Sequence, residues 1–514
     1  MMFSIRYIFI FLFLSSYLTG YEIDRLSLDE KIGQLFIAPV PPRATQKDVE
    51  RVIYLVEDKK VGSVIFMEGE SALQKKQVEL LKQRCSVPLL TFQDCEKGVG
   101  MRLSDVPSLP KNLTLGAITD LSFLQAFGKE VAAQCRGVGI VGSLAPVVDV
   151  NSNPKNLVIG QRSFGEDPYE VAQRAVAVMR GIQEGGVLAC AKHFPGHGGT
   201  YVDSHYSLPI IQKSLQELKD LELIPFQAMI DEGVDMVMMG HLLIPSLSDQ
   251  PSSLSYEIIT ELLREEMGFE GVIVTDALNM RALTNQQSLD KILLQAFEAG
   301  ADLLLVTASE RAKCRYFIEK AIPKAIDQIK QKCLEGEIDE AEIDRRVQRV
   351  VALRKRVQNA YVSTNCSVKQ ELFHQAVTVV GERFSSLEEG EEIALVQSKP
   401  DSELEQLLIE YSRVKTYSFE EIEEASNHSN LIFHYQKNDP AHLIPKQATI
   451  LLFDTPYLLE SIDHKGPILV GYENEIEAKR AVVKALFGKI PALGKLPVQI
   501  SKEEMEETTW NQRP

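Results

Sequence analysis

Four of the nine histidines in this 514-residue sequence lie close together, at His193, His197, His205 and His241. Imidazole titrates near neutral pH, so grouped histidines are suited to hold a metal ion or to transfer protons. On a helix, the spacing of His193 and His197 would place both rings on one face, as in zinc sites. Pro195 and Gly196 between them argue against a helix. A metal site built from loop histidines and Asp276 is therefore the less favoured interpretation.

Proton transfer is favoured by the glycine-rich stretch KHFPGHGGTYVDSHYSLP, which spans residues 192–209. Asp203 and His205 are two positions apart. In an extended or tightly turned loop the carboxylate can accept a hydrogen bond from one ring nitrogen and leave the other free to move a proton. Gly196, Gly198 and Gly199 would let this loop move over a substrate. In the alternative interpretation, Asp203 caps a turn and His205 is a surface residue.

Eight short apolar runs, each followed by an amphipathic stretch, must position these side chains. Such an alternation predicts parallel strands with crossover helices, and eight units in roughly 280 residues match the size of a (β/α)8 TIM-type barrel. An open, doubly wound sheet is the alternative. The runs are Ile32–Val40, Val61–Met67, Val87–Phe92, Val138–Val150, Val187–Lys192, Val234–Met239, Gly271–Thr275 and Asp302–Thr307.

A barrel of this kind carries its chemistry at the carboxyl ends of its strands and in the loops that follow them. Five of the predicted strands end in charged or imidazole side chains, which would share one mouth. These residues are Asp94, Asp149, Lys192 with His193, His241, and Asp276.

Further segments flank the predicted barrel of residues 21–310. Residues 311–363 are highly charged and predict a helical connecting arm, and residues 364–514 predict a smaller C-terminal α/β sandwich domain. Residues 1–20 combine Arg6 with an apolar run, which is typical of a signal peptide, with an uncleaved membrane anchor as the alternative. We therefore expect an exported protein, periplasmic or extracytoplasmic.

Composition narrows the range of partners. The formal net charge of −17 disfavours binding to nucleic acid. Seven scattered cysteines without a CxxC pair predict neither a disulfide framework nor a thiolate zinc site. They are Cys85, Cys95, Cys135, Cys190, Cys314, Cys333 and Cys366.

Several motifs in order resemble those of the bacterial β-N-acetylglucosaminidases of glycoside hydrolase family 3. The resemblance rests on KHFPGHG with the following DSH and LP, and on VTDALNM, APVVDVN, IGQRSFGEDP and SSLS, and it covers residues 26–310. The stretch GYENEIEAKRAVVKALFGKIPALGKLPV also resembles the second domain of longer members. The family fold is a (β/α)8 barrel.

The resemblance implies a retaining exo-β-N-acetylglucosaminidase that acts on peptidoglycan fragments or related glycans without metal or organic cofactor, and no stable protein partner is implied. Asp276 matches the nucleophile, which would form a covalent glycosyl-enzyme, and His205 with Asp203 matches an acid/base dyad. Asp94, Arg102, Arg162, Lys192 and His193 match positions that hold the sugar.

Two departures from the family pattern leave the substrate preference open. Gly199 stands where the family usually has an acidic residue, and the run from Asp94 reads DCEKGV instead of DQEGG. The alternatives are a β-glucosidase or β-xylosidase of the same family, a metal-dependent barrel hydrolase, and a degenerate glycan-binding protein.

Overall fold

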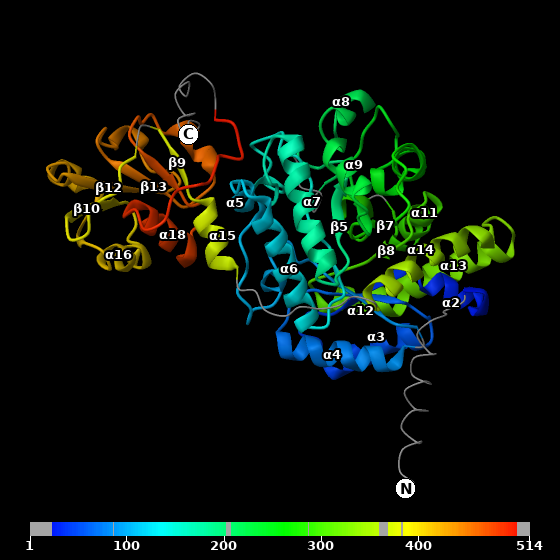
Figure 1. Ribbon diagram of the computed structural model, residues 1–514. Helices are drawn as coiled ribbons and strands as arrows, with labels where there is room; N and C mark the ends of the chain where they lie inside the picture. The colour runs from blue at the N-terminus through cyan, green and yellow to red at the C-terminus, as the bar shows by residue number, and fades with distance from the viewer. Residues whose placement is uncertain are drawn as a thin grey trace, which may run out of the picture.

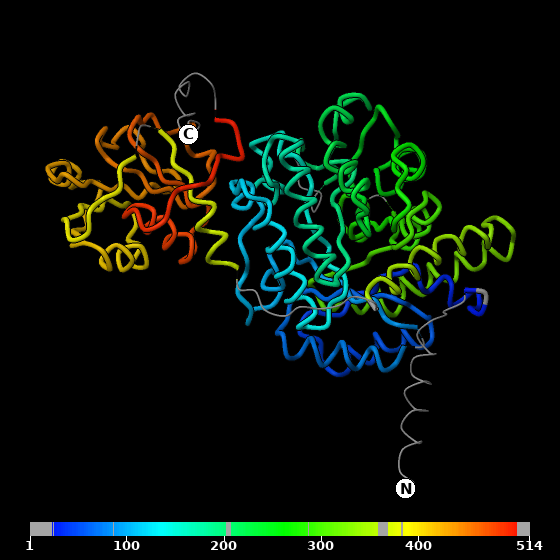
Figure 2. The backbone as a smooth tube through the Cα atoms, in the orientation of Figure 1, coloured from blue at the N-terminus to red at the C-terminus, as the bar shows by residue number. Residues whose placement is uncertain are grey.

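The computed structural model describes residues 23–85, 87–201, 207–285, 287–358, 368–381 and 384–500. Asp203, His205 and the predicted signal segment lie outside the described residues. The described chain forms two bodies, which Figures 1 and 2 show side by side. We call residues 23–358 the N-terminal part and residues 368–500 the C-terminal part. Within the described residues, no helix is long and apolar enough to cross a membrane.

The described residues of the N-terminal part form eight strands, and each of the eight predicted runs overlaps one of them. Two parallel sheets form, with the orders β4-β3-β2-β1-β8 and β5-β6-β7. Isolated parallel bridges, Gly142↔Leu188 and Val274↔Leu303, connect the two sheets at both edges. The strands are β1 (Phe36–Val40), β2 (Ser63–Phe66), β3 (Leu90–Gln93), β4 (Gly142–Ser143), β5 (Cys190–Phe194), β6 (Met236–Met239), β7 (Val272–Thr275) and β8 (Leu304–Leu305).

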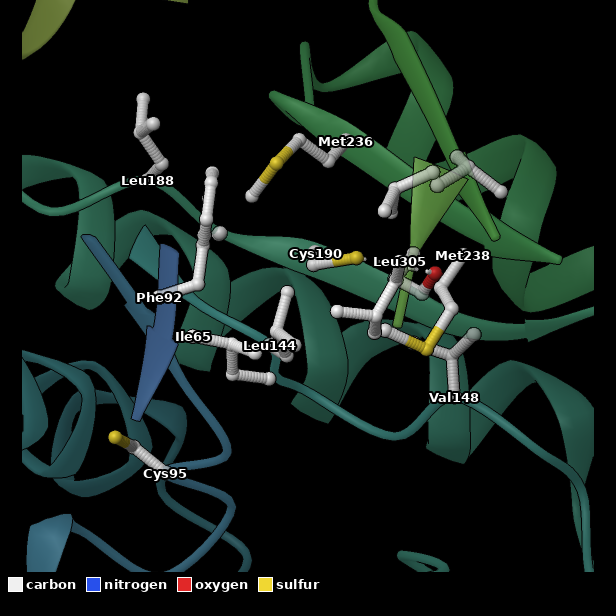
Figure 3. Packing of buried hydrophobic residues seen from close by; sticks show 14 of the residues in the cluster. Ile65, Phe92, Cys95, Leu144, Val148, Leu188, Cys190, Met236, Met238 and Leu305 are labelled. Carbon is white, nitrogen blue, oxygen red and sulfur yellow. Dashed lines mark hydrogen bonds between the residues drawn. The ribbon is translucent and has the colours of Figure 1, made fainter. Parts of the chain in front are cut away.

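Every residue of these strands is buried. Strands covered on both faces read as continuous apolar runs, which is why the sequence pattern located them. Figure 3 shows the packing between the sheets, where Phe92 of β3, Cys190 of β5, Met238 of β6 and Leu305 of β8 point into one interior.

Helices follow the strands and cover the sheets from outside (Figure 1). Their starts are locally encoded: Thr45 and Asp48 form a capping box at α3, and Asp167 caps α7 ahead of Pro168. The longer ones are α3 (Gln46–Glu57), α4 (Ser71–Arg84), α6 (Leu121–Gly137), α7 (Pro168–Glu184), α9 (Leu223–Asp231), the π-helix Glu257–Glu266 and α11 (Leu289–Glu298). Short helical segments are Ile23–Arg25, α2 (Leu28–Gly33), Val99–Met101, α5 (Asn112–Gly116), Gly160–Arg162, α8 (Leu215–Lys219), Ser252–Leu254 and α10 (Arg281–Thr284).

The segment predicted as a connecting arm is helical, but it also packs against the amino ends of the strands. On its last helix, Arg346 donates to the carbonyl oxygens of Phe297 (2.5 Å) and Ala301 (3.1 Å). Arg354 donates to the carbonyl oxygens of Pro88 (2.8 Å) and Gly62 (3.3 Å). The segment therefore forms a floor beneath the sheets. It comprises α12 (Arg311–Tyr316), the π-helix Phe317–Ala321, α13 (Ile322–Leu334) and α14 (Glu340–Gln358).

The C-terminal part is a six-stranded sheet with the order β11-β10-β12-β13-β14-β9, parallel except for the antiparallel pair of β14 and β9. Helices α15, α16 and α18 pack on one face, and residues of α17 and the 3-10 helix Pro456–Ser461 pack on the other. The strands are β9 (Thr378–Val380), β10 (Glu392–Gln397), β11 (Arg413–Tyr417), β12 (Asn430–Tyr435), β13 (Thr449–Leu452) and β14 (Ile468–Val470). The helices are α15 (Lys369–Ala376), α16 (Ser402–Ile409), Phe419–Glu421, α17 (Ile422–Ala425), Ala441–Leu443, Pro456–Ser461 and α18 (Ile476–Leu486).

Candidate active site

The predicted site residues that the structure describes lie at or just beyond the carboxyl ends of the strands. Asp94 directly follows β3, Lys192 and His193 are part of β5, and Asp276 directly follows β7. Arg102 and Arg162 come from the loops after β3 and β4. Because all these strands are parallel, their carboxyl ends face the same side of the sheets.

Five side chains form one network of ion pairs. Asp94 binds Arg102 through Oδ2 at 2.5 Å and Lys192 through Oδ1 at 3.0 Å. Glu96 binds Lys192 at 2.8 Å and Arg162 at 2.7 Å. Lys192, whose side chain is 3% exposed, is therefore shared by two carboxylates. The network brings together four of the predicted sugar-binding residues.

The charges of this network are mutually stabilised. Burial opposes ionisation of Asp94 and Glu96, but the adjacent Lys192 and arginines outweigh it and hold the pKa of both carboxyls below the ordinary range. Burial likewise opposes the charge of Lys192, yet Asp94 and Glu96 raise its pKa. Three cations and two carboxylates remain charged at neutral pH, and such groups are strong hydrogen-bonding partners for sugar hydroxyls.

Glu96 was not among the predicted site residues. Its side chain is only 7% exposed, and it receives two hydrogen bonds from the guanidinium of Arg162, from Nε at 2.9 Å and from Nη2 at 2.7 Å. The sequence feature that could have identified Glu96 is its position two residues after Asp94 in the DCEKGV run. Both carboxylates could then reach the same end of the sheets.

His193 joins the network to a second buried carboxylate. Its Nδ1 lies 2.7 Å from Oδ2 of the fully buried Asp149, and its Nε2 lies 3.3 Å from Nη2 of Arg162. A carboxylate only accepts, so Nδ1 of His193 donates the hydrogen bond to Asp149. The two contacts together fix the orientation of the His193 ring.

Asp149 organises the start of the glycine-rich loop. It accepts hydrogen bonds from the backbone nitrogens of His193 (3.2 Å) and His197 (2.7 Å). Burial would raise its pKa, but His193 and His197 outweigh burial and lower it. The sequence placed Asp149 at a strand end without assigning it to the site, and the structure shows that it holds two of the clustered histidines.

His197 is a structural histidine in this arrangement. Burial, together with the nearby His193, lowers its pKa to about 4. Its Nδ1 lies 2.8 Å from the hydroxyl of Thr200. Among the described residues, no group of three or more His, Cys, Asp or Glu side chains is arranged to hold a metal ion.

The glycines of the loop serve close packing at the positions described. A Cβ on Gly198 would lie 1.6 Å from the carbonyl oxygen of Val150, so no side chain fits there. Asn156 donates to the carbonyl oxygens of both His197 (2.9 Å) and Gly198 (3.0 Å). The described loop is thus closely packed as far as Gly198, and its movement over a substrate stays a prediction.

Asp276 is an ionised carboxylate at the end of β7. Its Oδ1 accepts a hydrogen bond from the backbone nitrogen of Ala277 at 2.7 Å. Burial opposes its charge, but His241, His193, this hydrogen bond and Lys192 together lower its pKa. His241 itself is fixed by Ser253, at 2.7 Å from its Nδ1. A charged, half-buried carboxylate at the end of a strand is suited to nucleophilic attack.

Comparisons with known proteins agree on one family. Residues 27–353 match the model described as "Glycosyl hydrolase family 3 N terminal domain". The chain is 33% identical over 279 residues to Beta-hexosaminidase A of Pseudoalteromonas piscicida, a match that covers 49% of this chain and 46% of that protein. It is 34% identical over 275 residues to Beta-hexosaminidase of Neisseria meningitidis serogroup C, covering 51% of this chain and 75% of the relative.

A solved structure is similar over nearly the whole chain. It is the structure of a glycoside hydrolase family 3 beta-N-acetylglucosaminidase from Paenibacillus sp. str. FPU-7, which is 30% identical. The superposition has a TM-score of 0.75 and covers 93% of this chain and 99% of that one. The likeness therefore includes both the N-terminal and the C-terminal parts.

Proposed function

Because this chain belongs to glycosyl hydrolase family 3, we propose that it is a retaining exo-β-N-acetylglucosaminidase that removes terminal N-acetylglucosamine from peptidoglycan fragments or related glycans. The relatives are named beta-hexosaminidases, and the similar structure is that of a beta-N-acetylglucosaminidase. These names support the choice of N-acetylglucosamine as the sugar. The observation that carries the proposal is Asp276, an ionised carboxylate that lies beside a polar network at the carboxyl ends of the strands.

In the proposed mechanism Asp276 attacks the anomeric carbon while the bond to the leaving oxygen breaks. His205, oriented by Asp203, donates the proton that the leaving oxygen takes. The resulting ester between Asp276 and the sugar is then hydrolysed, when the neutral His205 removes a proton from water and the carboxylate is released. The configuration at the anomeric carbon is retained because it is inverted twice.

The same proposal assigns sugar binding to Asp94, Arg102, Arg162, Lys192 and His193. Their mutual ion pairs pre-orient the donors and acceptors before a sugar arrives, which reduces the ordering cost on binding. Lys192 also favours the charged form of Asp276.

The finer features of the fold are part of this proposal. We interpret the two sheets, joined by bridges at both edges, as one (β/α)8 barrel over residues 21–310, with a separate α/β domain over residues 364–514. Export through residues 1–20 fits a substrate derived from the cell wall.

Turnover of nitrophenyl N-acetylglucosaminide and of nitrophenyl glucoside tests the proposal. We expect the N-acetylglucosaminide to have the higher kcat/KM, whereas a preference for the glucoside would favour a β-glucosidase. Asp276→Ala should abolish turnover, and Asp231→Ala, at the exposed end of α9, is the matched control. Turnover that a chelator removes and zinc restores would point instead to a metal-dependent hydrolase.

A further inference from the structure

The C-terminal part reaches across to the N-terminal part through a buried carboxyl. Glu473 follows β14, and its side chain lies in the contact between the two parts, where the residue is 4% exposed. Its Oε1 accepts hydrogen bonds from the backbone nitrogen of Lys111 at 2.8 Å and from the hydroxyl of Thr114 at 2.5 Å. Both donors belong to the start of α5, so Glu473 fixes this short helix.

Helix α5 in turn holds the segment that carries Arg162. Asn112 donates from Nδ2 to the carbonyl oxygen of Arg162 at 2.7 Å. Lys111 donates from Nζ to Oε1 of Gln161 at 2.6 Å. Hydrogen bonds at both ends of the Lys111–Asn112 backbone thus connect Glu473 to the residue whose guanidinium contacts Glu96 and His193.

A second contact reaches the loop after Asp149. The hydroxyl of Tyr457 accepts a hydrogen bond from Nδ2 of Asn151 and donates one to Oε1 of Glu166, each at 2.6 Å. Within the described residues, Oδ1 of the fully buried Asn151 has no hydrogen-bond partner, so Tyr457 supplies the hydrogen bond of that side chain.

The two parts also approach each other closely here. Glu166 accepts from the backbone nitrogen of Gln499 at 2.8 Å and donates its own to the carbonyl oxygen of Pro497 at 3.1 Å. A Cβ on Gly165 would lie 2.4 Å from that same oxygen of Pro497. Residues 161–166 are therefore held by the C-terminal part on one side and by α5 on the other.

We propose that the C-terminal part is a positioning element of the active site, in which Glu473 sets the place of Arg162 and Tyr457 sets the place of the loop that follows Asp149. Among the described residues, the hydrogen bonds of these two side chains go to Lys111, Thr114, Asn151 and Glu166. Both act through hydrogen bonds on segments whose own side chains form the polar network. The inference rests on the proposed function, because it concerns how that site holds its sugar.

A contact that only held the two parts together would not need a buried carboxyl with hydrogen bonds to α5. Apolar packing would suffice for adhesion, and burial of an ionisable carboxyl carries a desolvation cost. Burial raises the pKa of Glu473, although Thr114 and Lys111 oppose the shift. We expect a buried hydrogen-bond acceptor such as Glu473, despite its desolvation cost, where the position of its donors matters for function. Misplacement of a site by about 1 Å can reduce the rate about 100-fold.

Steady-state kinetics of full-length variants on nitrophenyl N-acetylglucosaminide test the proposal. Glu473→Ala removes the acceptor, and we expect KM to rise at least about tenfold with a smaller change in kcat, because Arg162 would hold the sugar in both the ground state and the transition state. Glu473→Gln keeps an oxygen acceptor and should restore KM to within about threefold. Tyr457→Phe should also raise KM.

Two variants in the same part serve as controls. Glu475→Gln alters a carboxylate that pairs with Lys369 of the C-terminal part at 2.8 Å, two positions from Glu473. Tyr411→Phe removes a hydroxyl from a ring that stacks on Phe487, with centroids 4.9 Å apart. Both should leave KM and kcat at the wild-type values, and thermal unfolding followed by circular dichroism reports any loss of fold.

The outcomes separate this inference from the proposed function. Glu473→Ala and Tyr457→Phe proteins that fold and show wild-type KM would overturn the inference, as would a Glu473→Gln protein no better than Glu473→Ala. A wild-type chain that turns over no N-acetylglucosaminide would overturn the proposed function. In that case calorimetric titration of the wild type and the same variants with N-acetylglucosamine decides the inference. Variant affinities equal to that of the wild type would refute the inference, and so would a wild type that does not bind the sugar.

Discussion

Replacement of Lys192 by methionine tests the central claim about the network, namely that one buried ammonium neutralises two carboxylates. Methionine keeps most of the volume of the lysine side chain and removes its charge. Nζ of Lys192 lies 3.0 Å from Asp94 and 2.8 Å from Glu96, and its side chain is 3% exposed. The variant therefore leaves the buried Glu96 and the half-buried Asp94 with one arginine each.

The magnitude follows from the burial of the partners. Removal of one partner of a buried ion pair costs about 3–5 kcal/mol, because the other charge stays buried without compensation. Arg102 and Arg162 still bind Asp94 and Glu96, so we expect about 3 kcal/mol, the lower end of that range. Lys219→Met is the control, since Lys219 pairs with Glu266 on the surface with 41% of its side chain exposed, and should cost about 0–1 kcal/mol.

The cost should depend on pH in a defined direction. The folded-state pKa values of Asp94 and Glu96 lie below the ordinary range, so their stabilising contribution is fully present above the pKa of the unfolded chain. That contribution is lost as the pH falls through the folded-state values. The difference between wild type and Lys192→Met should therefore be large at pH 7 and should narrow as the pH falls below about 4.

Urea unfolding followed by circular dichroism measures the free energy of unfolding at each pH, and kcat/KM on nitrophenyl N-acetylglucosaminide measures the loss of sugar orientation. We expect kcat/KM to fall about 100-fold. Equal costs for Lys192→Met and Lys219→Met, or a difference that does not narrow in acid, would refute the shared-cation reasoning.

Three further predictions concern the proposed chemistry. His205→Ala should retain more activity on nitrophenyl substrates than on poor leaving groups, because nitrophenol needs little protonation, and equal losses on both would contradict its acid role. Asp149→Asn should lower both kcat/KM and the free energy of unfolding, because an amide cannot accept all the hydrogen bonds from His193 and His197. We expect the free energy of unfolding to fall by about 1–3 kcal/mol. Unchanged values in kinetics and in urea unfolding would contradict this prediction. The pKa of Asp276 lies below the ordinary aspartate value of 3.8, so the nucleophile should stay ionised as the pH falls to 3.8. A loss of kcat/KM above pH 3.8 that is caused by protonation of Asp276 would contradict the structure.

The strands of the N-terminal part could be predicted because both of their faces are buried, which leaves unbroken apolar runs in the sequence. Strand β11, Arg413–Tyr417, at the edge of the C-terminal sheet does not follow this pattern. Its first four residues are exposed or half-buried, so its sequence carries no apolar run. The place of the short antiparallel β9 beside β14 depends on pairing far along the chain, which no local pattern shows.

The sequence correctly placed Asp94, Lys192 and Asp276 at the carboxyl ends of strands, and their roles stay predictions. The partners that decide their charge state were not predictable from local pattern. Glu96 acquires its role from Lys192 and Arg162, which are remote in sequence, and Glu473 lies in another part of the chain altogether. Contacts between residues that are remote in sequence produce no local pattern from which they could be predicted.

The floor beneath the sheets also has a consequence for how the chain folds during synthesis. The carbonyl oxygens of Gly62 and Pro88, next to the amino ends of two early strands, each accept a hydrogen bond from Arg354, which lies beyond β8, the last described strand of the N-terminal part. Roughly 50 residues separate the end of β8 from Arg354, and translation at about 5–20 residues per second adds them in about 3–10 s. During that interval β2 and β3 lack the hydrogen bonds that α14 supplies beside their amino ends, so we expect the N-terminal part to complete its packing only after α14 has been made.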